Sequence, residues 1–237
     1  MTAPSDGLRE VYERRAEREY AQPWKRNPLD RKFARTLELV EAQLPCGAFL
    51  DAGCGDGRYL AAIASSAQSP RRIVGSDLSE RILDTARAAT APRNVELVQA
   101  NLEALPFDDG SFDVVLCAQV IEHVLDVRAA LAELARVLRI GGTLVLTTDN
   151  ERNLVTRALH LGRLRKQAGF DFPHRDFRAT ELRVLVEGAG LRTTHQETFR
   201  FIAPVRAPQR LLNALDEHLP EHGVGDILAL VARKDAA

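Results

Sequence analysis

The stretch FLDAGCGDGRYL, residues 49–60, decides the fold. An apolar run ends in an acid, and glycines follow at alternate positions 53, 55 and 57 before helix-forming residues resume. This order is typical of a buried strand, a tight glycine turn and a helix. In an open α/β sheet, ligands bind beyond the carboxyl ends of the strands. The stretch therefore predicts a ligand-binding turn after the first strand.

Segments typical of strands and of helices alternate beyond this stretch. Strands are predicted at 47–53, 71–77, 94–100, 111–118 and 143–149, with helices at 29–44, 57–67, 79–90 and 127–139. Ser79 is expected to cap the helix that follows it, and Gly141-Gly142 to end the last helix of this series. Short connections between the elements predict an α/β fold, a Rossmann-like doubly wound sheet that is mostly parallel.

The remaining segments are expected to complete this sheet. Strands at 191–199 and 226–233 are expected to pair as an antiparallel hairpin at its edge, which gives seven strands with an antiparallel C-terminal strand. Further helices are predicted at 8–20, 151–167, 178–189 and 207–218.

The composition indicates a soluble globular protein. Charged residues make up 27% and hydrophobic residues 45%, and the formal net charge is -1. This charge provides no field that would recruit nucleic acid. No apolar run approaches the roughly 20 residues that span a bilayer, and the polar first residues argue against a secretory signal. Three cysteines without close paired spacing predict reduced thiols and a cytoplasmic location.

Two acids distinguish between the ligands that such a turn can hold. A dinucleotide fingerprint requires a third glycine where this chain has Arg58. Asp51 would repel a pyrophosphate but attract an ammonium group, and Asp77 could accept both hydroxyls of a ribose. S-adenosylmethionine has a cationic end and a ribose and lacks phosphate, so it fits both acids. A nucleotide-binding oxidoreductase is the competing interpretation.

Four linked segments carry a family resemblance. They are LDAGCGDGRYL, VGSDLSERIL, NLEALPFDDGSFDVVLCAQVIEHV and ELARVLRIGGTLVLTT, in this order between residues 50 and 148. They resemble the successive motifs of class I S-adenosylmethionine-dependent methyltransferases. Within this class the chain is most similar to the small-molecule branch, methyltransferase type 11, which includes ubiquinone and menaquinone biosynthesis enzymes.

This resemblance implies how the methionine end of the cofactor is held. Asp51 and the backbone of Gly53 would bind it, with Gly55 in the same turn and Ala118 along the methionine chain. Arg31 is a candidate partner for the cofactor carboxylate, and the alternative for this residue is a solvated position on a helix.

The resemblance also implies the contacts of the nucleoside. Asp77 would bind the ribose and Leu78 would pack on the adenine. Asn101, by its side chain, and Leu102, by its backbone amide, would meet the adenine edge. Family members more often have Asp at position 101, but an Asn oxygen still accepts a bond from the adenine amino group.

Chemistry at the acceptor is predicted from AQVIEHV, residues 118–124. Gln119, Glu122 and His123 have the i, i+3, i+4 spacing that places side chains on one face of a helical turn. His123 is the candidate general base, because imidazole accepts a proton near neutral pH, and His174 is a second catalytic candidate.

This cluster also resembles a metal site. Small-RNA 3′-terminal 2′-O-methyltransferases have an E-x-x-E-H cluster and a later histidine, and ubiquinone O-methyltransferases have a similar one. The corresponding metal ligands would be Gln119, Glu122, His123 and His174. Gln119 replaces a carboxylate and would weaken such a site, so a divalent metal is not the favoured expectation. A purely structural turn is the third interpretation.

The expected protein is a single methyltransferase domain over 1–237. It comprises an N-terminal helical lid (1–44), a cofactor-binding core (45–149) and an acceptor-side segment with the C-terminal hairpin (150–237). The expected reaction is methylation of a small-molecule acceptor at oxygen. Metal-assisted 2′-O-methylation of a small RNA, the oxidoreductase and a cofactor-binding protein without catalysis are the alternatives. The basic amphipathic segment 151–167 is a candidate for peripheral membrane contact. Nucleic acid is not an expected partner, and the sequence leaves the oligomeric state open.

Overall fold

The computed structural model describes residues 7, 9, 10, 12, 13, 31–91, 93–151, 174–199 and 225–236. The helix predicted at 207–218, almost all of the one at 151–167 and most of the one at 8–20 lie outside these residues. Among the described residues, no helix combines the length and apolar character needed to cross a membrane.

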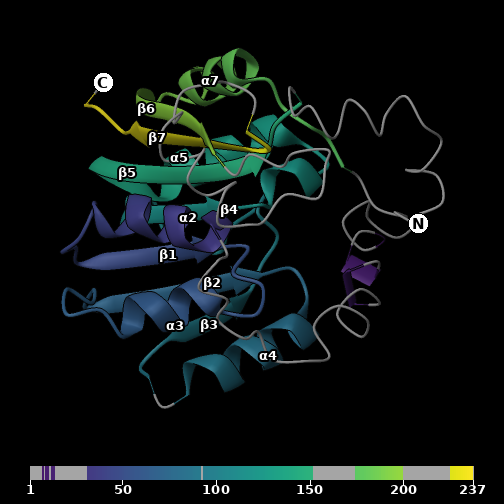
Figure 1. The fold of residues 1–237 in the computed structure, drawn as a ribbon. Coiled ribbons are helices and arrows are strands. Elements are labelled where there is room, and N and C mark those ends of the chain that lie inside the picture. Colours follow the sequence, from purple (N-terminus) through teal and green to yellow (C-terminus); the bar gives the residue numbers. More distant parts are fainter. Residues whose placement is uncertain are drawn as a thin grey trace, which may run out of the picture.

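A seven-stranded sheet organises the described chain. Its strands are β1 (Ala48–Ala52), β2 (Arg72–Asp77), β3 (Glu96–Gln99), β4 (Phe112–Ala118), β5 (Leu138–Asp149), β6 (Arg192–Phe199) and β7 (Ile227–Arg233). Their order in the sheet is β3-β2-β1-β4-β5-β7-β6 (Figure 1). β1 to β5 pair in parallel, and β7 lies antiparallel between β5 and β6. The predicted fold class and the C-terminal hairpin are confirmed.

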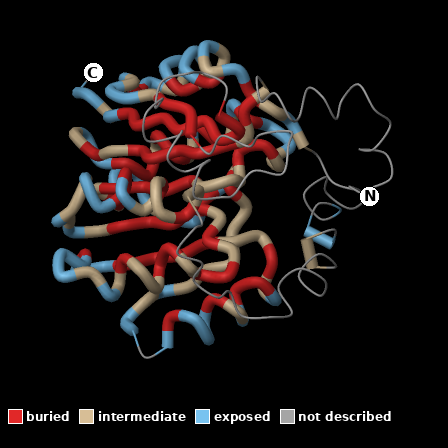
Figure 2. The backbone as a smooth tube through the Cα atoms, viewed as in Figure 1, coloured by how far each residue is buried: buried red, intermediate tan, exposed pale blue. Residues whose placement is uncertain are grey.

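Helices cover both faces of this sheet. They are α2 (Arg31–Glu41), α3 (Arg58–Ala64), α4 (Glu80–Thr90), α5 (Val127–Val137) and α7 (Ala179–Gly188), with a short 3-10 turn η1 (Ile121–His123). α2, α3 and α4 pack on one face, and α5 and α7 pack on the other. Along β4, Val114 and Leu116 belong to one core cluster, whereas Val115 between them belongs to the other. β4 is therefore buried on both faces, and in Figure 2 the central strands are coloured mostly as buried.

Capping residues fix where two of these helices begin. The Ser79 hydroxyl accepts a hydrogen bond from the Ile82 amide at 3.2 Å, so the predicted cap of α4 is confirmed. Asp126 caps α5 by accepting from the amides of Arg128 and Ala129. Such caps satisfy backbone donors that the first helical turn leaves unpaired.

The end of α5 differs from the prediction. The helix ends at Val137 and β5 begins at Leu138, so Gly141-Gly142 lies inside a strand and not at a helix end. Leu138 pairs with Phe112, and the register then shifts before Thr143 pairs with Val114. Gly141 has a φ of 78°, which makes it the left-handed residue of this irregularity. A side chain at Gly142 would meet the carbonyl oxygen of Arg139 at 2.9 Å.

A tertiary ion pair ties α2 to the far edge of the sheet. The Arg35 guanidinium donates from Nε and Nη2 to the two carboxylate oxygens of Glu197 in β6, at 2.7 and 2.9 Å. The Glu197 side chain is only 5% exposed, so its charge depends on this guanidinium and on His195, whose Nε2 lies 3.2 Å from Oε2. The pair joins residues that are far apart in sequence and so helps to position α2 over the sheet.

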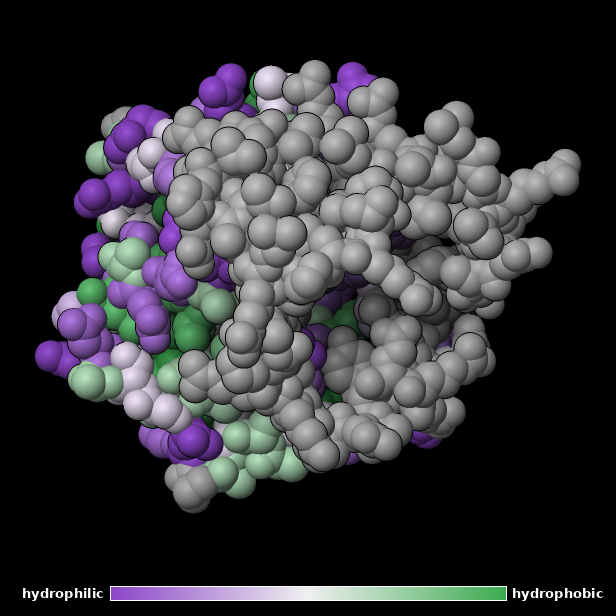
Figure 3. Space-filling view, viewed as in Figure 1, coloured by the Kyte–Doolittle hydropathy of each residue, from purple (hydrophilic) through white to green (hydrophobic). Residues whose placement is uncertain are grey.

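The surface of the described residues carries no concentrated apolar face. The exposed large hydrophobic residues are Leu125, Ile140 and Val184, and they belong to three separate parts of the chain. In the view of Figure 3, hydrophilic side chains are spread around the rim of the visible described surface, with smaller hydrophobic areas between them. Scattered exposed apolar side chains of this kind are normal for a globular domain.

Candidate cofactor and acceptor site

The glycine turn after β1 has the backbone geometry that the sequence predicts. Gly53, Gly55 and Gly57 have φ angles of 85°, 55° and 76°, in the left-handed region that glycine adopts without strain. The amides of Gly53 and Cys54 both donate to the carbonyl of Ser76 in β2, at 2.7 and 2.8 Å. The turn is therefore held against the carboxyl end of β2, and α3 follows it at once.

Asp51 is a buried carboxylate without a partner among the described residues. Its residue exposure is 1%, and both side-chain oxygens lack a hydrogen bond. Burial raises its pKa to about 8, and the charges of Asp77 and Asp56 add to the shift. A buried acid of this kind is costly unless a cation or hydrogen-bond donors meet it. The ammonium end of S-adenosylmethionine would supply both, so Asp51 fits the predicted cofactor.

Asp77, the last residue of β2, is held rigidly beside the same turn. One carboxylate oxygen accepts from the Gly55 amide and the other from the Ser79 amide, both at 3.0 Å. Burial raises its pKa, and these backbone hydrogen bonds oppose the rise. Each carboxylate oxygen has a further lone pair, so the side chain can still accept hydroxyl donors such as those of a ribose.

The residues predicted for the adenine end lie after β2 and β3. Leu78 is half-buried, and its carbonyl accepts from the Gln99 side chain at 3.0 Å. The Asn101 side-chain oxygen accepts from the Glu103 amide at 3.0 Å, so this oxygen already caps its own turn. Leu102 is buried in the core. The fold thus brings these positions to the carboxyl-end edge that carries Asp51 and Asp77.

Ala118 and Arg31 also lie at this edge. Ala118 is half-buried and ends β4, next to β1. Arg31 begins α2, and its Nε is buried without a hydrogen bond among the described residues. The following residue, Lys32, is close enough for its charge to act on Glu122, which follows β4. The start of α2 therefore lies beside the carboxyl ends of the strands, where a partner for the cofactor carboxylate would be needed.

The predicted helical face of Gln119, Glu122 and His123 is wrong. The turn η1 spans only Ile121–His123, and Gln119 precedes it with a φ of 59°. The Gln119 amide donates to the Thr147 carbonyl at 2.8 Å and so extends the β4–β5 pairing by one residue. This pairing keeps Gln119 out of the turn, and its side-chain nitrogen is buried without a partner in the described part of the chain.

Glu122 is a buried acid in the turn η1 that follows β4. It is 2% exposed, and its carboxylate accepts from the Thr148 hydroxyl at 2.8 Å. Burial raises its pKa to about 7, and the charge of Asp149 adds to the effect. Glu122 therefore faces the end of β5.

His174 meets two acids that were not predicted from the sequence. Its Nε2 lies 3.1 Å from Oδ1 of Asp176 and 3.5 Å from Oδ2 of Asp149. The ring centroids of His123 and His174 are 5.2 Å apart, so these two predicted residues do come together. Asp149 closes β5 as Asp51 closes β1, and that shared pattern could have identified it. Nothing in the sequence pattern indicates Asp176.

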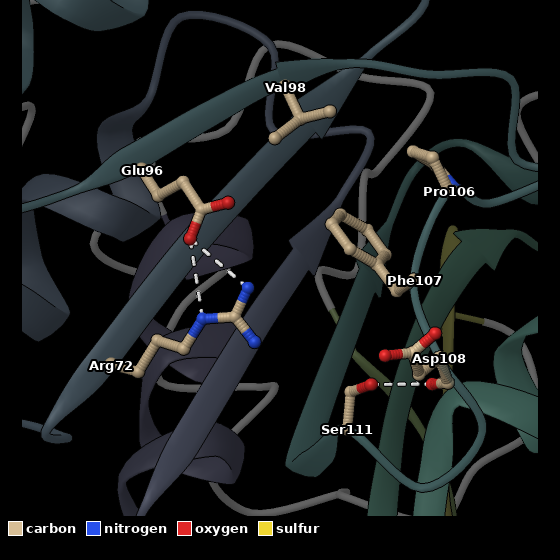
Figure 4. Close-up of a pocket in the computed structure, with 7 residues that line it drawn as sticks. All are labelled: Arg72, Glu96, Val98, Pro106, Phe107, Asp108 and Ser111. Carbon is tan, nitrogen blue, oxygen red and sulfur yellow. Dashed lines mark hydrogen bonds and ion pairs between the residues drawn. The ribbon is translucent and has the colours of Figure 1, made fainter.

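A separate cavity lies at the opposite edge of the sheet. It has a volume of about 330 Å³ and is lined by Arg72, Glu96, Val98, Pro106, Phe107, Asp108 and Ser111 (Figure 4). Arg72 and Glu96 begin β2 and β3 and form an ion pair at 3.1 Å. Ligands of open α/β sheets bind at the carboxyl ends, so this cavity does not compete with the glycine turn.

Comparisons with known proteins find a methyltransferase-like region in the chain. Residues 50–146 match the family model described as a methyltransferase domain. The demethylmenaquinone methyltransferase of Lactococcus lactis is 37% identical over 99 residues, which cover 40% of this chain and 39% of that protein. The chain spans half or less of the length of the first curated relatives it matches.

Solved structures share the fold. An S-adenosylmethionine-dependent methyltransferase from Mesorhizobium loti has a TM-score of 0.60 at 22% identity, covering 83% of this chain and 96% of that one. The [4+2]-cyclase SpnF has a TM-score of 0.63 at 21% identity, covering 86% and 81%. A fold can serve different reactions, so these similarities support the architecture alone. Residues 50–146 match a methyltransferase domain, and S-adenosylmethionine is the cofactor that this family implies.

Proposed function

We propose that this chain, whose residues 50–146 match a methyltransferase domain, transfers a methyl group from S-adenosylmethionine to an oxygen atom of a small-molecule acceptor. The observation that carries the proposal is the buried carboxylate of Asp51, which has no hydrogen-bond partner among the described residues, beside the left-handed glycine turn. A dinucleotide would bring a pyrophosphate to this acid and raise its cost further. A cationic amino-acid end lowers that cost.

The cofactor would supply an electrophilic methyl group on a sulfonium. The rest of the cofactor would leave as a neutral thioether, which requires no acid catalyst. The protein must therefore orient the acceptor, exclude water and remove a proton where the acceptor carries one. His123 is the proposed base, because it follows β4 and lies beside His174 at the carboxyl-end edge of the sheet. His174 lies against the carboxylates of Asp149 and Asp176 and is therefore not proposed as the base.

The alternatives receive less support. A nucleotide-binding oxidoreductase would need a third glycine where this chain has Arg58, and the family match is to a methyltransferase domain. Methylation of a small RNA would require the metal cluster predicted around Glu122 and His123, and Gln119 lies outside the turn that carries these two residues. The predicted membrane contact lies in 151–167, almost wholly outside the described residues, and the cytoplasmic location also stays a prediction. The three-part division of the chain stays a prediction as well.

Ligand binding provides the first test. The full chain should show a thermal upshift with S-adenosylhomocysteine and none with NAD. Transfer of a labelled methyl group from S-adenosylmethionine should then be measured over phenols, carboxylic acids and amines, with hydroxyl acceptors labelled most. An upshift with NAD alone would contradict the proposed cofactor. Labelling of amines only would retain the cofactor and contradict the oxygen acceptor.

The base is tested with a pair of histidine variants. His123→Gln should lower the rate of methyl transfer to a hydroxyl acceptor at pH 7 by at least about 100-fold, in line with typical general-base contributions. The affinity for S-adenosylhomocysteine should stay unchanged. His195→Gln is the control, because this side chain is 44% exposed on β6 and glutamine keeps an N–H donor for Glu197, which lies 3.2 Å from His195 Nε2. Equal rates for the two variants would remove His123 from the mechanism.

A further inference from the structure

We propose that Asp149, His174 and Asp176 form a binding site for one divalent metal ion on the acceptor side of the domain. The site differs from the metal cluster that the sequence suggested, because only His174 is common to both. It concerns metal binding by the chain itself and does not depend on the proposed methyl transfer.

The distances between the ligand atoms suit a coordination sphere. His174 Nε2 lies 3.1 Å from Asp176 Oδ1 and 3.5 Å from Asp149 Oδ2, and the ligand atoms of the three residues lie within 4.8 Å of one another. Adjacent ligands placed about 2.1 Å from a six-coordinate ion are separated by about 3 Å. The two distances from His174 therefore lie close to the spacing of ligands around a single ion.

The chemistry of these groups also favours a cation between them. A neutral imidazole has one N–H at most, so His174 Nε2 cannot donate fully to two carboxylates that approach the same nitrogen. A metal ion resolves this conflict because it accepts a lone pair from the imidazole and from both carboxylates. An imidazolium shared between the two acids is the competing arrangement.

Backbone hydrogen bonds hold the ligands in place. The Phe177 amide donates to the Asp149 carbonyl at 3.1 Å, and the Glu151 amide donates to the Phe177 carbonyl at 2.9 Å. The Arg175 amide donates to the Glu122 carbonyl at 3.0 Å. The segment that carries His174 and Asp176 is thus fixed along the ends of β4 and β5. A preorganised ligand set of this kind lowers the cost of ion binding.

Access to the site matches a metal that keeps open positions. The side chains of Asp176, His174 and Asp149 are 10%, 19% and 37% exposed, so the ligands are neither fully buried nor fully solvated. Three protein ligands leave room for water or an oxygen of an acceptor. One imidazole nitrogen and two carboxylate oxygens suit ions of intermediate hardness such as Mn²⁺ or Zn²⁺. Such an ion would lower the pKa of a bound hydroxyl.

The test measures metal binding without any cofactor. The full chain, treated with a chelator and dialysed, is titrated with Mn²⁺ or Zn²⁺ by calorimetry, and one ion per chain is expected. Asp149→Asn, His174→Gln and Asp176→Asn should each lower the affinity at least about tenfold. The matched controls are His195→Gln and Asp84→Asn, whose parent side chains are 44% and 71% exposed on other elements.

Thermal melting and the ¹⁵N shift of His174 complement the metal titration. Thermal melting shows whether each variant is folded, and any single folded ligand variant is enough for the comparison. The ¹⁵N shift of His174 Nε2 should change on addition of Zn²⁺. No bound ion, equal affinity in the ligand and control variants, or an unchanged imidazolium signal would overturn the site, whereas loss of S-adenosylhomocysteine binding alone would overturn only the proposed function.

Discussion

The proposed cofactor side, around Asp51 and Asp77, and the proposed acceptor side, around Glu122, Asp149 and His174, are built in different ways. On the cofactor side, Asp51, Gly53 and Asp77 belong to two consecutive strand–turn–helix units, so one continuous stretch of chain contains them. On the acceptor side, Glu122, Asp149 and His174 come from three separate elements. The first arrangement follows from local geometry, and the second exists only after the sheet has assembled. The two sides should therefore respond differently to substitution.

The two sides also differ in how their charges are balanced. Asp51 has no hydrogen-bond partner among the described residues, whereas Glu122 is bonded to Thr148 and Asp149 lies against His174. A ligand is needed to complete the cofactor side. The acceptor side already satisfies part of its own polar groups. This contrast indicates that loss of an acid costs ligand affinity on the first side and costs stability or metal binding on the second.

Replacement of Asp51 provides the strongest test of this contrast. Asp51→Asn should weaken S-adenosylhomocysteine binding by about 100-fold, roughly 3 kcal/mol, because a buried charge pair loses one partner. The same change should raise the melting temperature of the ligand-free protein, since it removes an unpaired buried carboxylate. Calorimetry and thermal melting measure both effects. Asp84→Asn is the surface control, and unchanged affinity in Asp51→Asn would disprove the role of this acid.

The pH dependence of stability sharpens the same comparison. The pKa of Asp51 is about 8 in the folded protein and near 3.8 for a freely solvated aspartate, so between these values the folded state holds a proton that the unfolded state releases. Stability from this group is present below pH 4 and is lost as pH rises through about 8. The ligand-free protein should melt at a lower temperature at pH 8 than at pH 5. Asp51→Asn should reduce the difference in melting temperature between pH 5 and pH 8. The same difference in the parent and the variant would contradict the raised pKa of Asp51.

A methyl group added at Gly53 should damage the fold of the cofactor side. The Cβ of Gly53→Ala would lie 2.3 Å from Cγ2 of Val120, and the residue would keep a φ of 85°. Overpacking and a strained backbone together should cost about 2 kcal/mol of unfolding free energy. Urea denaturation measures this change. Gly188→Ala is the control, because nothing lies within 4 Å of its added carbon and a helix favours alanine.

A second variant relates this cost to the contact with Val120. Val120→Ala in combination with Gly53→Ala should recover part of the lost stability, because the clashing methyl groups are removed. No recovery would assign the whole cost to the backbone angle.

The ion pair between α2 and β6 tests a contact that only the tertiary structure creates. Arg35→Met should cost about 1.5 kcal/mol of unfolding free energy, because it leaves the buried Glu197 without its guanidinium partner. Arg192→Met removes an exposed pair with Asp235, 59% and 47% exposed, and should change stability far less than Arg35→Met does, because solvent screens the pair. Denaturation of the two variants compares them directly. Similar losses would show that burial does not set the energy of the pair.

The smallest expected effect has the opposite sign. Gln119 has a φ of 59°, which an L side chain adopts only at a cost. Gln119→Gly should therefore stabilise the protein by about 0.5 kcal/mol, after the entropy lost by glycine on folding is included. Thermal melting measures this gain. Gln99→Gly in β3, where the backbone is extended, should be destabilising instead.

The sequence by itself determined the cofactor side. Parallel strands end at the same edge of a sheet, so Asp51 and Asp77 had to meet once the strand–turn–helix pattern was recognised. The tertiary structure decided the acceptor side. The pairing of Gln119 with Thr147 and the irregularity at Gly141 depend on how β4 and β5 align. The approach of His174 to Asp149 depends on a segment that returns to β5, and no local preference encodes such a contact because its energy arises between residues distant in sequence.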